Sequence, residues 1–385
     1  MTRLPAPEPE ALIHSQELTE QIRQEISRRD GWISFADYMA LALYHPTLGY
    51  YTGGSRKLGA AGDFTTAPEI SPIFGQCVAR TVAAVLSETH GDVLEIGAGS
   101  GRLAADLLLT LQDLNQLPDR YLILDVSPEL QDRQRTTILN TAPALVDRVE
   151  WVAQIPAGFT GCMVGNELLD AMPFHVIETD ENQKILERGV AWQEDQFIWQ
   201  ARPLAAGNLQ DQVSALFLPP NYRSEVQLSA QGFIRTAAEQ LTHGVLLLID
   251  YGFDESQYYH PQRDQGTLMC HYRHHSLDDP FFLPGLQDIT CHIDFSAIYN
   301  VANQCGLSLE GYTNQASYLL DADLAECLSR QESTSATERA KHAAAVNKLF
   351  SPAEMGELFK VIGFSRGLSG PRLPGFRQSD LSGSL

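Results

Sequence analysis

The sequence is poor in cysteine and lacks any long apolar run. Its 385 residues include six cysteines, and no two of them form a C-x-x-C pair. A disulfide framework is therefore not expected, and a reducing cytoplasm is the natural setting. No apolar run approaches the roughly 18 residues of a membrane-spanning helix. Residues 1–13 lack the basic and apolar regions of a secretory signal.

Basic residues are also scarce, with 27 Lys and Arg against 48 Asp and Glu, which gives a formal net charge of −21. This balance disfavours nucleic acid as the main partner, because phosphate binding needs a basic surface. It fits a basic protein or peptide substrate attracted by long-range electrostatics. An acidic protein without such a partner would have the same composition, so charge alone leaves both possibilities open.

One group of cysteines and histidines could be interpreted as metal ligands. It consists of three close pairs, Cys270-His271, His274-His275 and Cys291-His292. Their spacing matches no common zinc pattern. We therefore expect no metal.

The most informative stretch that is present runs from Asp92 to Leu103. A short apolar run containing Glu95 is followed by three alternating glycines and then by a helical pattern over residues 102–111. Glycine lets the backbone turn sharply and approach a ligand without interference from a Cβ atom. A buried strand, a glycine turn and a helix in this order are typical of a nucleotide-type cofactor site.

The spacing of the glycines indicates which cofactor this loop would hold. Gly97, Gly99 and Gly101 form G-x-G-x-G, whereas a dinucleotide site has G-x-G-x-x-G with its pyrophosphate over a helix N-terminus. S-adenosylmethionine (SAM) carries an ammonium and a sulfonium, so Glu95 suits it better than it suits a diphosphate. SAM is the favoured interpretation, with a dinucleotide and a purely structural turn as alternatives.

The rest of the chain alternates strands with helices, which predicts an α/β doubly wound, Rossmann-like sheet. Expected strands lie at 92–96, 121–125, 149–152, 161–167, 244–252, 307–312 and 359–364. Expected helices lie at 13–29, 34–43, 71–88, 102–111, 229–241 and 295–305, with a helical tract over 316–350 that is broken near 331–335.

Between these elements, alternating polarity over 175–205 predicts an antiparallel insertion, and 253–295 is expected to be a long loop region. We expect four segments: 1–90 with helices and a loop that covers the cofactor, 91–174 with the first half of the sheet, 175–240 with the insertion, and 241–385 with the rest.

Polar side chains follow several of the predicted strands at their carboxyl ends, where a doubly wound sheet binds its ligand. Asp125 could accept hydrogen bonds from both ribose hydroxyls of a nucleoside, although a surface acid at a strand end is the simpler alternative. Asn166, Glu167 and Asp170 follow the fourth strand, and Asp250-Tyr251 the fifth.

Asn166, Glu167 and Asp170 lie where methyl transfer would occur. Transfer from a sulfonium is an in-line displacement, so the protein must mainly hold the acceptor on the S–CH₃ axis. A guanidinium presents planar donors that paired carboxylates bind in bidentate fashion, so Glu167 and Asp170 would suit an arginine. The alternative is a pair of acids that complements a helix N-terminus.

With these segments in view, the chain strongly resembles the MidA-type class I SAM-dependent methyltransferases, from about residue 32 to residue 370. The family includes a mitochondrial complex I assembly factor that methylates an arginine of a core subunit. The matching stretches are 44–46, 49–51, 62–69, 74–75, 95–101, 165–173, 250–252, 266–268 and 288–295. The blocks at 62–69 and 166–173 are specific to the family.

The resemblance implies roles for residues that spacing alone does not assign. In the family the long N-terminal loop folds over the cofactor, so Gly62, Thr65, Thr66 and Pro68 are expected in the SAM pocket. The block at 288–295 is expected to form a wall of the site, with Asp288, His292 and Asp294 as polar candidates. His292 could equally be a structural histidine.

The sequence therefore predicts a SAM-dependent methyltransferase that acts on a protein arginine of a respiratory complex I-type subunit. A SAM-binding assembly factor without chemistry and a small-molecule methyltransferase remain alternatives. The sequence leaves the oligomeric state open, a homodimer included.

Overall fold

The computed structural model describes residues 4–53, 66–330 and 335–385. The chain divides into two units, each built from three separate stretches. Residues 65–168, 233–254 and 295–385 form what we call the parallel-sheet unit, and residues 1–64, 169–232 and 255–294 form the antiparallel unit. Among the described residues, no helix combines the length and the apolar character needed to cross a membrane.

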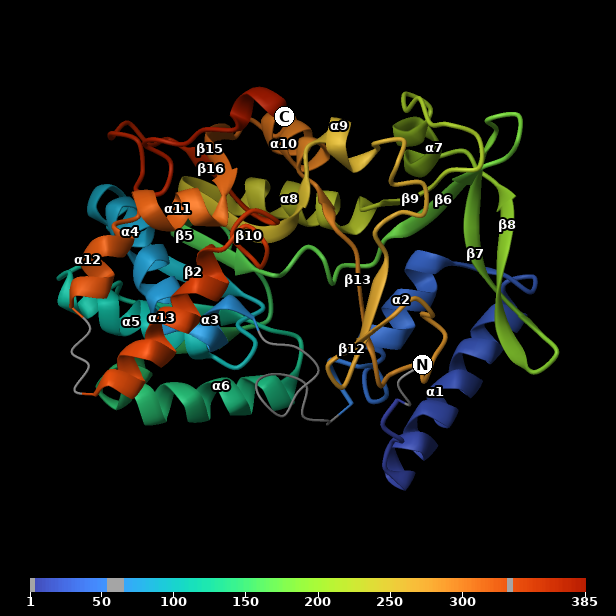
Figure 1. The fold of residues 1–385 in the computed structure, drawn as a ribbon, viewed down its shortest axis with the longest axis horizontal. Helices are drawn as coiled ribbons and strands as arrows, with labels where there is room; N and C mark the ends of the chain where they lie inside the picture. Colours follow the sequence, from blue (N-terminus) through green and yellow to red (C-terminus); the bar gives the residue numbers. More distant parts are fainter. Residues whose placement is uncertain (1–3, 54–65, 331–334) are drawn as a thin grey trace. The chain divides into compact units, whose positions relative to one another are not determined.

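The parallel-sheet unit contains a sheet with the strand order β15-β16-β10-β5-β2-β3-β4 (Figure 1). The strands are β2 (Asp92–Ile96), β3 (Tyr121–Leu124), β4 (Val149–Val152), β5 (Phe159–Asn166), β10 (Leu241–Phe253), β15 (Ser308–Asn314) and β16 (Phe359–Arg366). The five strands from β4 to β10 are parallel, whereas β16 is antiparallel to both β10 and β15. The carboxyl ends of β2, β3, β5 and β10 therefore lie along one edge of the sheet.

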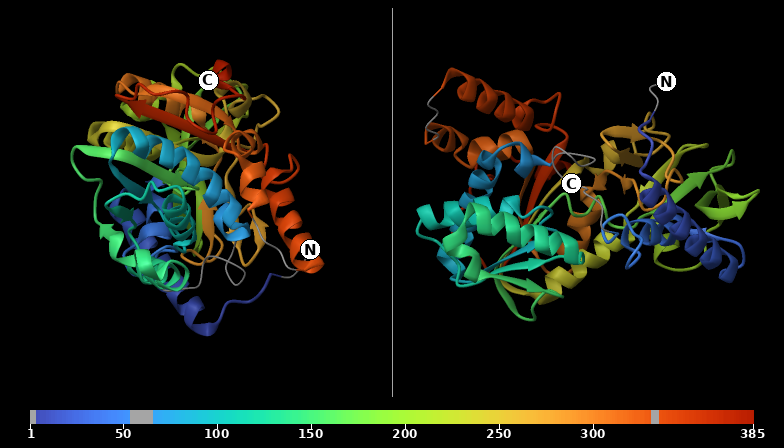
Figure 2. Two further views of the ribbon diagram at one scale, coloured as in Figure 1. Left: turned by 90° about the vertical axis from the view of Figure 1, so that its left-hand side faces the viewer. Right: turned by 90° about the horizontal axis from the view of Figure 1, so that it is seen from below.

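Helices cover both faces of this sheet (Figures 1 and 2). Successive strand residues point to opposite faces, yet Val93 and Leu94 on β2, like Leu246 and Leu247 on β10, are all fully buried. Strands that are buried on both faces have continuous apolar sequences. For this reason these strands could be predicted from the sequence. The helices of this unit are α3 (Ala67–Ile70), α4 (Pro72–Thr89), α5 (Arg102–Asp113), α6 (Pro128–Thr141), α10 (Phe295–Gln304), α11 (Gln315–Asp321), α12 (Leu324–Ser329) and α13 (Ala336–Phe350).

The 3₁₀ segments η1 (Pro143–Arg148) and η2 (Ser382–Ser384) complete this unit, and α8 (Leu228–Gln240) leads into β10.

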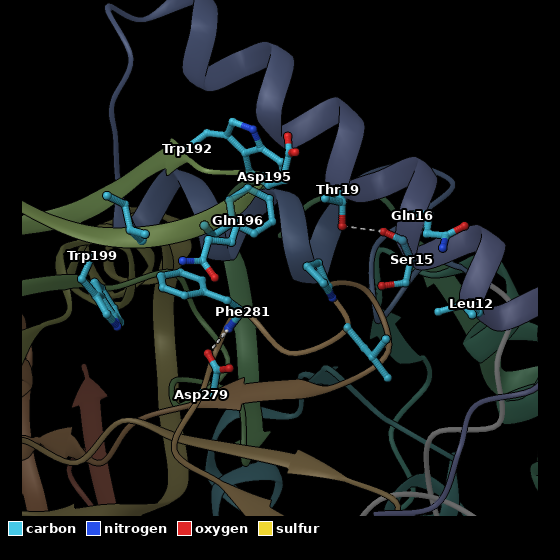
Figure 3. A pocket seen from close by; sticks show the side chains of 14 residues that line it. Leu12, Ser15, Gln16, Thr19, Trp192, Asp195, Gln196, Trp199, Asp279 and Phe281 are labelled. Carbon is cyan, nitrogen blue, oxygen red and sulfur yellow. Dashed lines mark hydrogen bonds between the residues drawn. The ribbon is translucent and has the colours of Figure 1, made fainter.

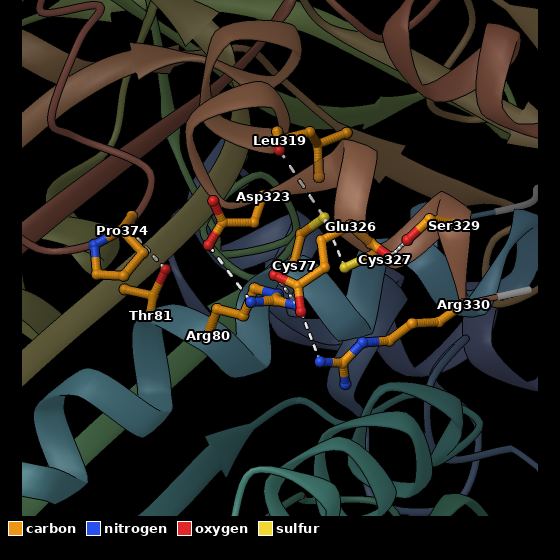
Figure 4. Close-up of polar contacts among 10 residues, drawn as sticks. All are labelled: Cys77, Arg80, Thr81, Leu319, Asp323, Glu326, Cys327, Ser329, Arg330 and Pro374. Atoms are coloured by element: carbon orange, nitrogen blue, oxygen red, sulfur yellow. Dashed lines mark hydrogen bonds and ion pairs between the residues drawn. The ribbon is translucent and has the colours of Figure 1, made fainter.

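Helices α4 and α12 are joined by polar contacts (Figure 4). The Arg80 guanidinium lies 3.3 Å from Asp323 and 3.2 Å from Glu326, and the Cys77 and Cys327 sulfurs are 4.0 Å apart. The hydrogen bond from Cys77, together with Arg80, lowers the pKa of the Cys327 thiol below its usual value.

The antiparallel unit has two sheets and its own apolar cluster. One sheet has the order β1-β7-β6-β9 with β8 on β7, and the other the order β12-β11-β13. The strands of these sheets are β1 (Ile33–Ser34), β6 (His175–Thr179), β7 (Ile185–Gln193), β8 (Gln196–Pro203), β9 (Arg223–Val226), β11 (Met269–Tyr272), β12 (His275–Leu277) and β13 (Asp288–Thr290). The short strand β14 (Ile293–Asp294) is part of neither sheet. Its helices are α1 (Pro9–Arg28), α2 (Phe35–Tyr44), α7 (Asn208–Val213) and α9 (Glu255–Tyr258).

Local chemistry explains why several helices begin where they do. Ser34 caps α2 by accepting from the Asp37 amide, and Ser71 caps α4 by accepting from the Ile73 amide. Helix α1 begins at Pro9, four residues before the predicted start, because proline is favoured in the first helical turn.

The predicted α/β doubly wound sheet and its antiparallel insertion are confirmed. The prediction of a long loop over 253–295 is wrong, since this region contains α9 and the strands β11 to β14. These strands have two to four residues each, too few to establish a period, and two of them pair across about 20 residues of chain. The helical tract also breaks at Asp323, whose φ is 62°, whereas residues 331–334 lie outside the described part of the chain.

Candidate functional site

The glycine loop follows β2 and turns in left-handed backbone conformations. Gly97, Gly99 and Gly101 have φ angles of 70°, 52° and 82°. The Gly97 amide donates to the Leu124 carbonyl at 2.9 Å, which ties the loop to the end of β3. A Cβ on Gly101 would lie 2.7 Å from the Gln134 Cα, so no larger residue fits there without moving the backbone. The loop therefore presents bare backbone at the carboxyl edge of the sheet.

Glu95 lies inside the sheet and is 2% exposed. Its Oε2 accepts a 2.5 Å hydrogen bond from the Tyr121 hydroxyl. Burial raises the pKa of Glu95 to about 7, and Asp125 and Asp106 add to the rise while Tyr121 opposes it. Glu95 thus has a partner within the protein, and the cofactor contact expected of it stays a prediction.

Asp125 follows β3 and is held by two hydrogen bonds. Its Oδ1 accepts from the Ser127 amide at 2.9 Å, and its Oδ2 accepts from the Gln134 side chain at 2.7 Å. Burial raises the pKa of Asp125 above its usual range. The next residue, Val126, is an apolar side chain that is 68% exposed beside this acid.

Gln134 on α6 is a residue that the sequence analysis missed. Its Nε2 donates to the Gly99 carbonyl at 3.2 Å as well as to Asp125, and its Oε1 accepts from Trp151 at 2.8 Å. One fully buried side chain thus joins the glycine loop, the acid after β3 and the end of β4. The sequence does not mark Gln134 as functional, because the helix that carries it is mostly polar. The one available indication is its position on the same helical face as the buried Leu130 and Ile138.

Asn166 and Glu167 stand at the end of β5. The Asn166 Nδ2 donates to Glu167 Oε1 at 3.2 Å, and the Glu167 amide donates to the Ile249 carbonyl at 2.8 Å. Glu167 adopts a left-handed φ of 48°, a conformation found at sites that need a fixed side-chain direction. The Asn166 Oδ1 is buried and has no hydrogen-bond partner among the described residues.

Asp250 and Tyr251 occupy the corresponding position on β10, where the Tyr251 amide donates to Asp250 Oδ1 at 2.9 Å. The parallel-sheet unit therefore brings together the predicted residues that follow β2, β3, β5 and β10. Two more of the predicted residues, Thr66 and Pro68, lie at the start of α3. The neighbouring Glu69 accepts from Ser100 of the glycine loop. The predicted Gly62 and Thr65 lie outside the described residues.

The remaining predicted residues belong to the antiparallel unit. The Asp170 carbonyl accepts from the Cys291 amide at 3.4 Å. The His292 amide donates to Thr267 Oγ1 at 3.0 Å, and the His292 carbonyl accepts from Gln227 at 2.6 Å. Asp288 and Asp294 are buried on β13 and β14. The catalytic roles expected of Asp170 and His292 stay predictions.

The parallel-sheet unit has the features that a nucleoside carrying an amino-acid group requires. Asp125 offers a fixed acceptor for ribose hydroxyls, and the exposed Val126 beside it offers an apolar surface for a base. The glycine loop leaves room for close backbone approach. The buried Asn166 Oδ1 can accept a hydrogen bond from a ligand donor. These residues fit SAM.

Comparison with known proteins agrees with this geometry. Residues 75–313 match the model of a family described as "Putative S-adenosyl-L-methionine-dependent methyltransferase". A Burkholderia thailandensis protein crystallised with S-adenosyl-homocysteine is similar over 100% of both chains, with 44% identity and a TM-score of 0.96.

Two curated relatives share less identity. The Danio rerio "Protein arginine methyltransferase NDUFAF7, mitochondrial" is 28% identical, with 86% of this chain and 82% of the relative covered. The Drosophila melanogaster homologue of that protein is also 28% identical, with 75% and 70% covered. The resemblance to MidA-type enzymes and the prediction of SAM as the cofactor are thereby confirmed, and the chain belongs to the family of S-adenosylmethionine-dependent methyltransferases.

Proposed function

We propose that this chain transfers a methyl group from SAM to an arginine of a protein, specifically of a respiratory complex I-type subunit, and so supports assembly of that complex. The observation that carries the proposal is the similarity to relatives named as protein arginine methyltransferases over 82% and 70% of their lengths. The chemistry of the residues at the end of β5 is consistent with it.

The cofactor's ribose would be bound by Asp125, which Gln134 and the Ser127 amide hold in one orientation. Val126 would contact the adenine, and the backbone of the glycine loop would lie against the amino-acid portion. Bound SAM supplies an electrophilic methyl group on its sulfonium. The protein then has to orient the acceptor and exclude water, because transfer is an in-line displacement.

Glu167 is the side chain in the parallel-sheet unit best suited to hold an arginine. A guanidinium stays protonated at neutral pH, so a carboxylate both orients it and accepts the proton that methylation releases. The Glu167 backbone is fixed by the hydrogen bond to Ile249. The neighbouring Asn166 Oδ1 can accept from a second N–H of the same guanidinium.

Charge and cysteine chemistry support a protein substrate in a reducing compartment. The net charge of −21 attracts a basic segment over long range. All six cysteines are free thiols, which fits the cytoplasm. The proposal does not depend on whether the chain acts as a monomer or as a homodimer.

The proposal is tested by mass spectrometry of proteomes from cells with and without the gene, searched for methylated arginine. Loss of an arginine methylation site on a complex I-type subunit in the deleted cells is the expected result. Unchanged arginine methylation, in cells whose purified protein still binds SAM, would contradict arginine as the acceptor and favour a small-molecule acceptor.

A second experiment separates an enzyme from a scaffold that only binds SAM. In the deleted cells, Glu167→Gln should bind SAM within twofold of the wild type but lose methyl transfer by at least about 100-fold, and complex assembly should fall with it. Restored assembly without methyl transfer would show that the chain acts as a scaffold. Exposed Glu150→Gln is the matched control and should behave as the wild type.

A further inference from the structure

The antiparallel unit contains a groove of about 600 Å³. It is formed by three elements: the first half of α1, the β7–β8 hairpin and the segment 279–284 (Figure 3). Its size falls within the roughly 300–1,000 Å³ of typical ligand sites. None of the residues assigned above to the cofactor or to methyl transfer lines it.

Aromatic side chains form the floor of this groove. Trp192 lies against Phe197 with ring centroids 4.8 Å apart, and Trp199 lies 5.1 Å from Phe281. The Arg188 guanidinium already lies 4.8 Å from the centre of the Trp199 ring. This cluster therefore accommodates a guanidinium within the protein itself, as expected for the attraction between a cation and an aromatic face.

Two charged residues line the groove, and both are acidic: Asp195 and Asp279. Each is exposed, and neither forms an ion pair within the described part of the chain. The Asp195 charge acts on Arg23, whose guanidinium is itself held by Glu20 through two 2.7 Å hydrogen bonds. The groove thus combines aromatic faces with two exposed carboxylates, which is complementary to a cation that carries apolar stem atoms.

Local backbone geometry fixes the Asp279 carboxylate and the turn that carries Asp195. Asp195 occupies the two-residue hairpin turn with Glu194, and their φ angles of 59° and 50° are those of a type I′ turn. Asp279 Oδ1 accepts from the Phe281 amide at 3.0 Å, and the Asp279 carbonyl accepts from Gln287 at 3.1 Å. A ligand would therefore meet an Asp279 carboxylate that is already positioned and an Asp195 side chain that projects from a defined turn.

The shape of the groove indicates a polypeptide. Four consecutive residues of β8, from Gln196 to Trp199, line it. Side chains alternate between the faces of a strand, so four in succession are consistent with a groove that runs along the strand. Within the described residues β8 pairs only with β7, which leaves its other edge available to a further strand.

We propose that this groove binds an extended, arginine-bearing segment of a partner polypeptide, which pairs with the edge of β8 and directs a guanidinium toward Asp195 and Asp279. Assigning the segment to the methyl-accepting protein rests on the proposed function, whereas the binding itself does not. The groove would then supply affinity for the substrate away from the methylated residue.

The test measures binding to the full-length chain without SAM, by fluorescence anisotropy. The probe is a labelled octapeptide with two arginines among valines and glycines, and its counterparts carry citrulline in place of arginine or N-methylated backbone amides. The wild type should bind the citrulline and N-methylated peptides at least about tenfold more weakly than the arginine peptide. Equal binding of arginine and citrulline peptides would overturn the proposal.

A double variant, Asp195→Asn with Asp279→Asn, should weaken binding of the arginine peptide about tenfold. The matched control is Asp211→Asn with Asp264→Asn, which removes two exposed acids of the same unit outside the groove and should change binding less than twofold. Equal losses in both double variants would show attraction by net charge alone and would overturn the proposal.

Hydrogen exchange identifies the site and excludes a second copy of the chain as the occupant. The arginine peptide should protect residues 193–199, and this protection should not depend on protein concentration. Protection that rises with protein concentration and is not displaced by peptide would show self-association and overturn the proposal. If the peptide binds as predicted but no arginine is methylated, the proposed function fails and the proposal for the groove stands. If arginine is methylated and the Asp195→Asn, Asp279→Asn variant changes neither kcat nor KM, the proposed function stands and the assignment of the groove to the substrate fails.

Discussion

The two units of this protein assemble their polar sites over different distances along the chain. In the parallel-sheet unit, the side-chain hydrogen bonds from Tyr121 to Glu95 and from Gln134 to Gly99 and Asp125 span 26, 35 and 9 residues, while the backbone bond from Glu167 to Ile249 spans 82. In the antiparallel unit, Glu225 reaches Thr267 over 42 residues, and Tyr38 reaches Pro280 over 242. The contacts around Glu95 and Asp125 join elements that are close in sequence, whereas Tyr38 and Pro280 lie far apart along the chain.

The largest effect is expected where the antiparallel unit depends on one buried acid. Glu225 accepts from the Thr267 amide and hydroxyl at 2.9 Å and from the Leu268 amide at 3.2 Å. Glu225→Ala leaves these donors without their acceptor and should cost about 4 kcal/mol of unfolding free energy. Urea unfolding measures this, with exposed Glu181→Ala as a control that should change it by less than about 0.5 kcal/mol. Similar values for the two variants would contradict the role of Glu225 as the acceptor on which this unit depends.

The next effect is a pH dependence of stability in the parallel-sheet unit. The Glu95 pKa of about 7 lies above the ordinary value of 4.5, so the folded state holds a proton that the unfolded state releases between these values. The stability from this proton is complete below about pH 4.5 and is lost as pH rises through 7. Glu95→Gln, which cannot ionise, should therefore gain up to about 3 kcal/mol relative to the wild type between pH 4.5 and 8.

Urea unfolding of the two proteins across this pH range is the measurement. The difference between them should grow as pH rises from about 4.5 to 7 and stay constant above about pH 7. A constant difference would show that Glu95 is not the buried carboxylic acid described above.

A smaller effect is expected at the glycine loop. Gly101→Ala places a Cβ 2.7 Å from the Gln134 Cα and 3.0 Å from its carbonyl, which must displace the loop. Affinity for SAM, measured by calorimetry, should fall about 100-fold, equivalent to about 2.7 kcal/mol. Gly158→Ala is the control, because Gly158 also has a positive φ of 67° but no atom within 4 Å of the added Cβ. Equal affinities for the two variants would place the cofactor elsewhere.

The smallest effect is expected for Gln134, which positions other groups. Gln134→Met keeps a similar volume but removes the hydrogen bonds to Gly99, Asp125 and Trp151. Affinity for SAM should fall about tenfold, since one good hydrogen bond contributes roughly 1 kcal/mol. Exposed Gln112→Met should leave the affinity unchanged. A loss as large as that in Gly101→Ala would mean that Gln134 itself contacts the cofactor.

The same contrast explains what the sequence could predict. The strands of the parallel-sheet unit are apolar runs that end in Glu95, Asp125 or Asn166, so both the sheet and its carboxyl edge were predictable. The alternation of polar and apolar residues predicted β6 to β8, because a sheet with one exposed face has that pattern in its sequence. The short strands β11 to β14 have no period of their own and were missed.

Two functional features could not be inferred from local pattern. Gln134 acts through partners on three other segments, and its own helix is mostly polar. The groove is formed by α1, β8 and the segment 279–284, which are separated by long stretches of chain. Only folding brings Trp199 and Phe281 together, and neither residue differs in sequence from an ordinary core aromatic.

The most direct test of the account is hydrogen exchange of the full-length protein with and without saturating SAM. We predict that SAM protects residues 97–101 and 125–134 at the carboxyl edge of the parallel sheet and leaves residues 193–199 of the β7–β8 hairpin unchanged. Protection confined to 193–199, with the glycine loop and Asp125 unaffected, would contradict the assignment of the cofactor to the parallel-sheet unit.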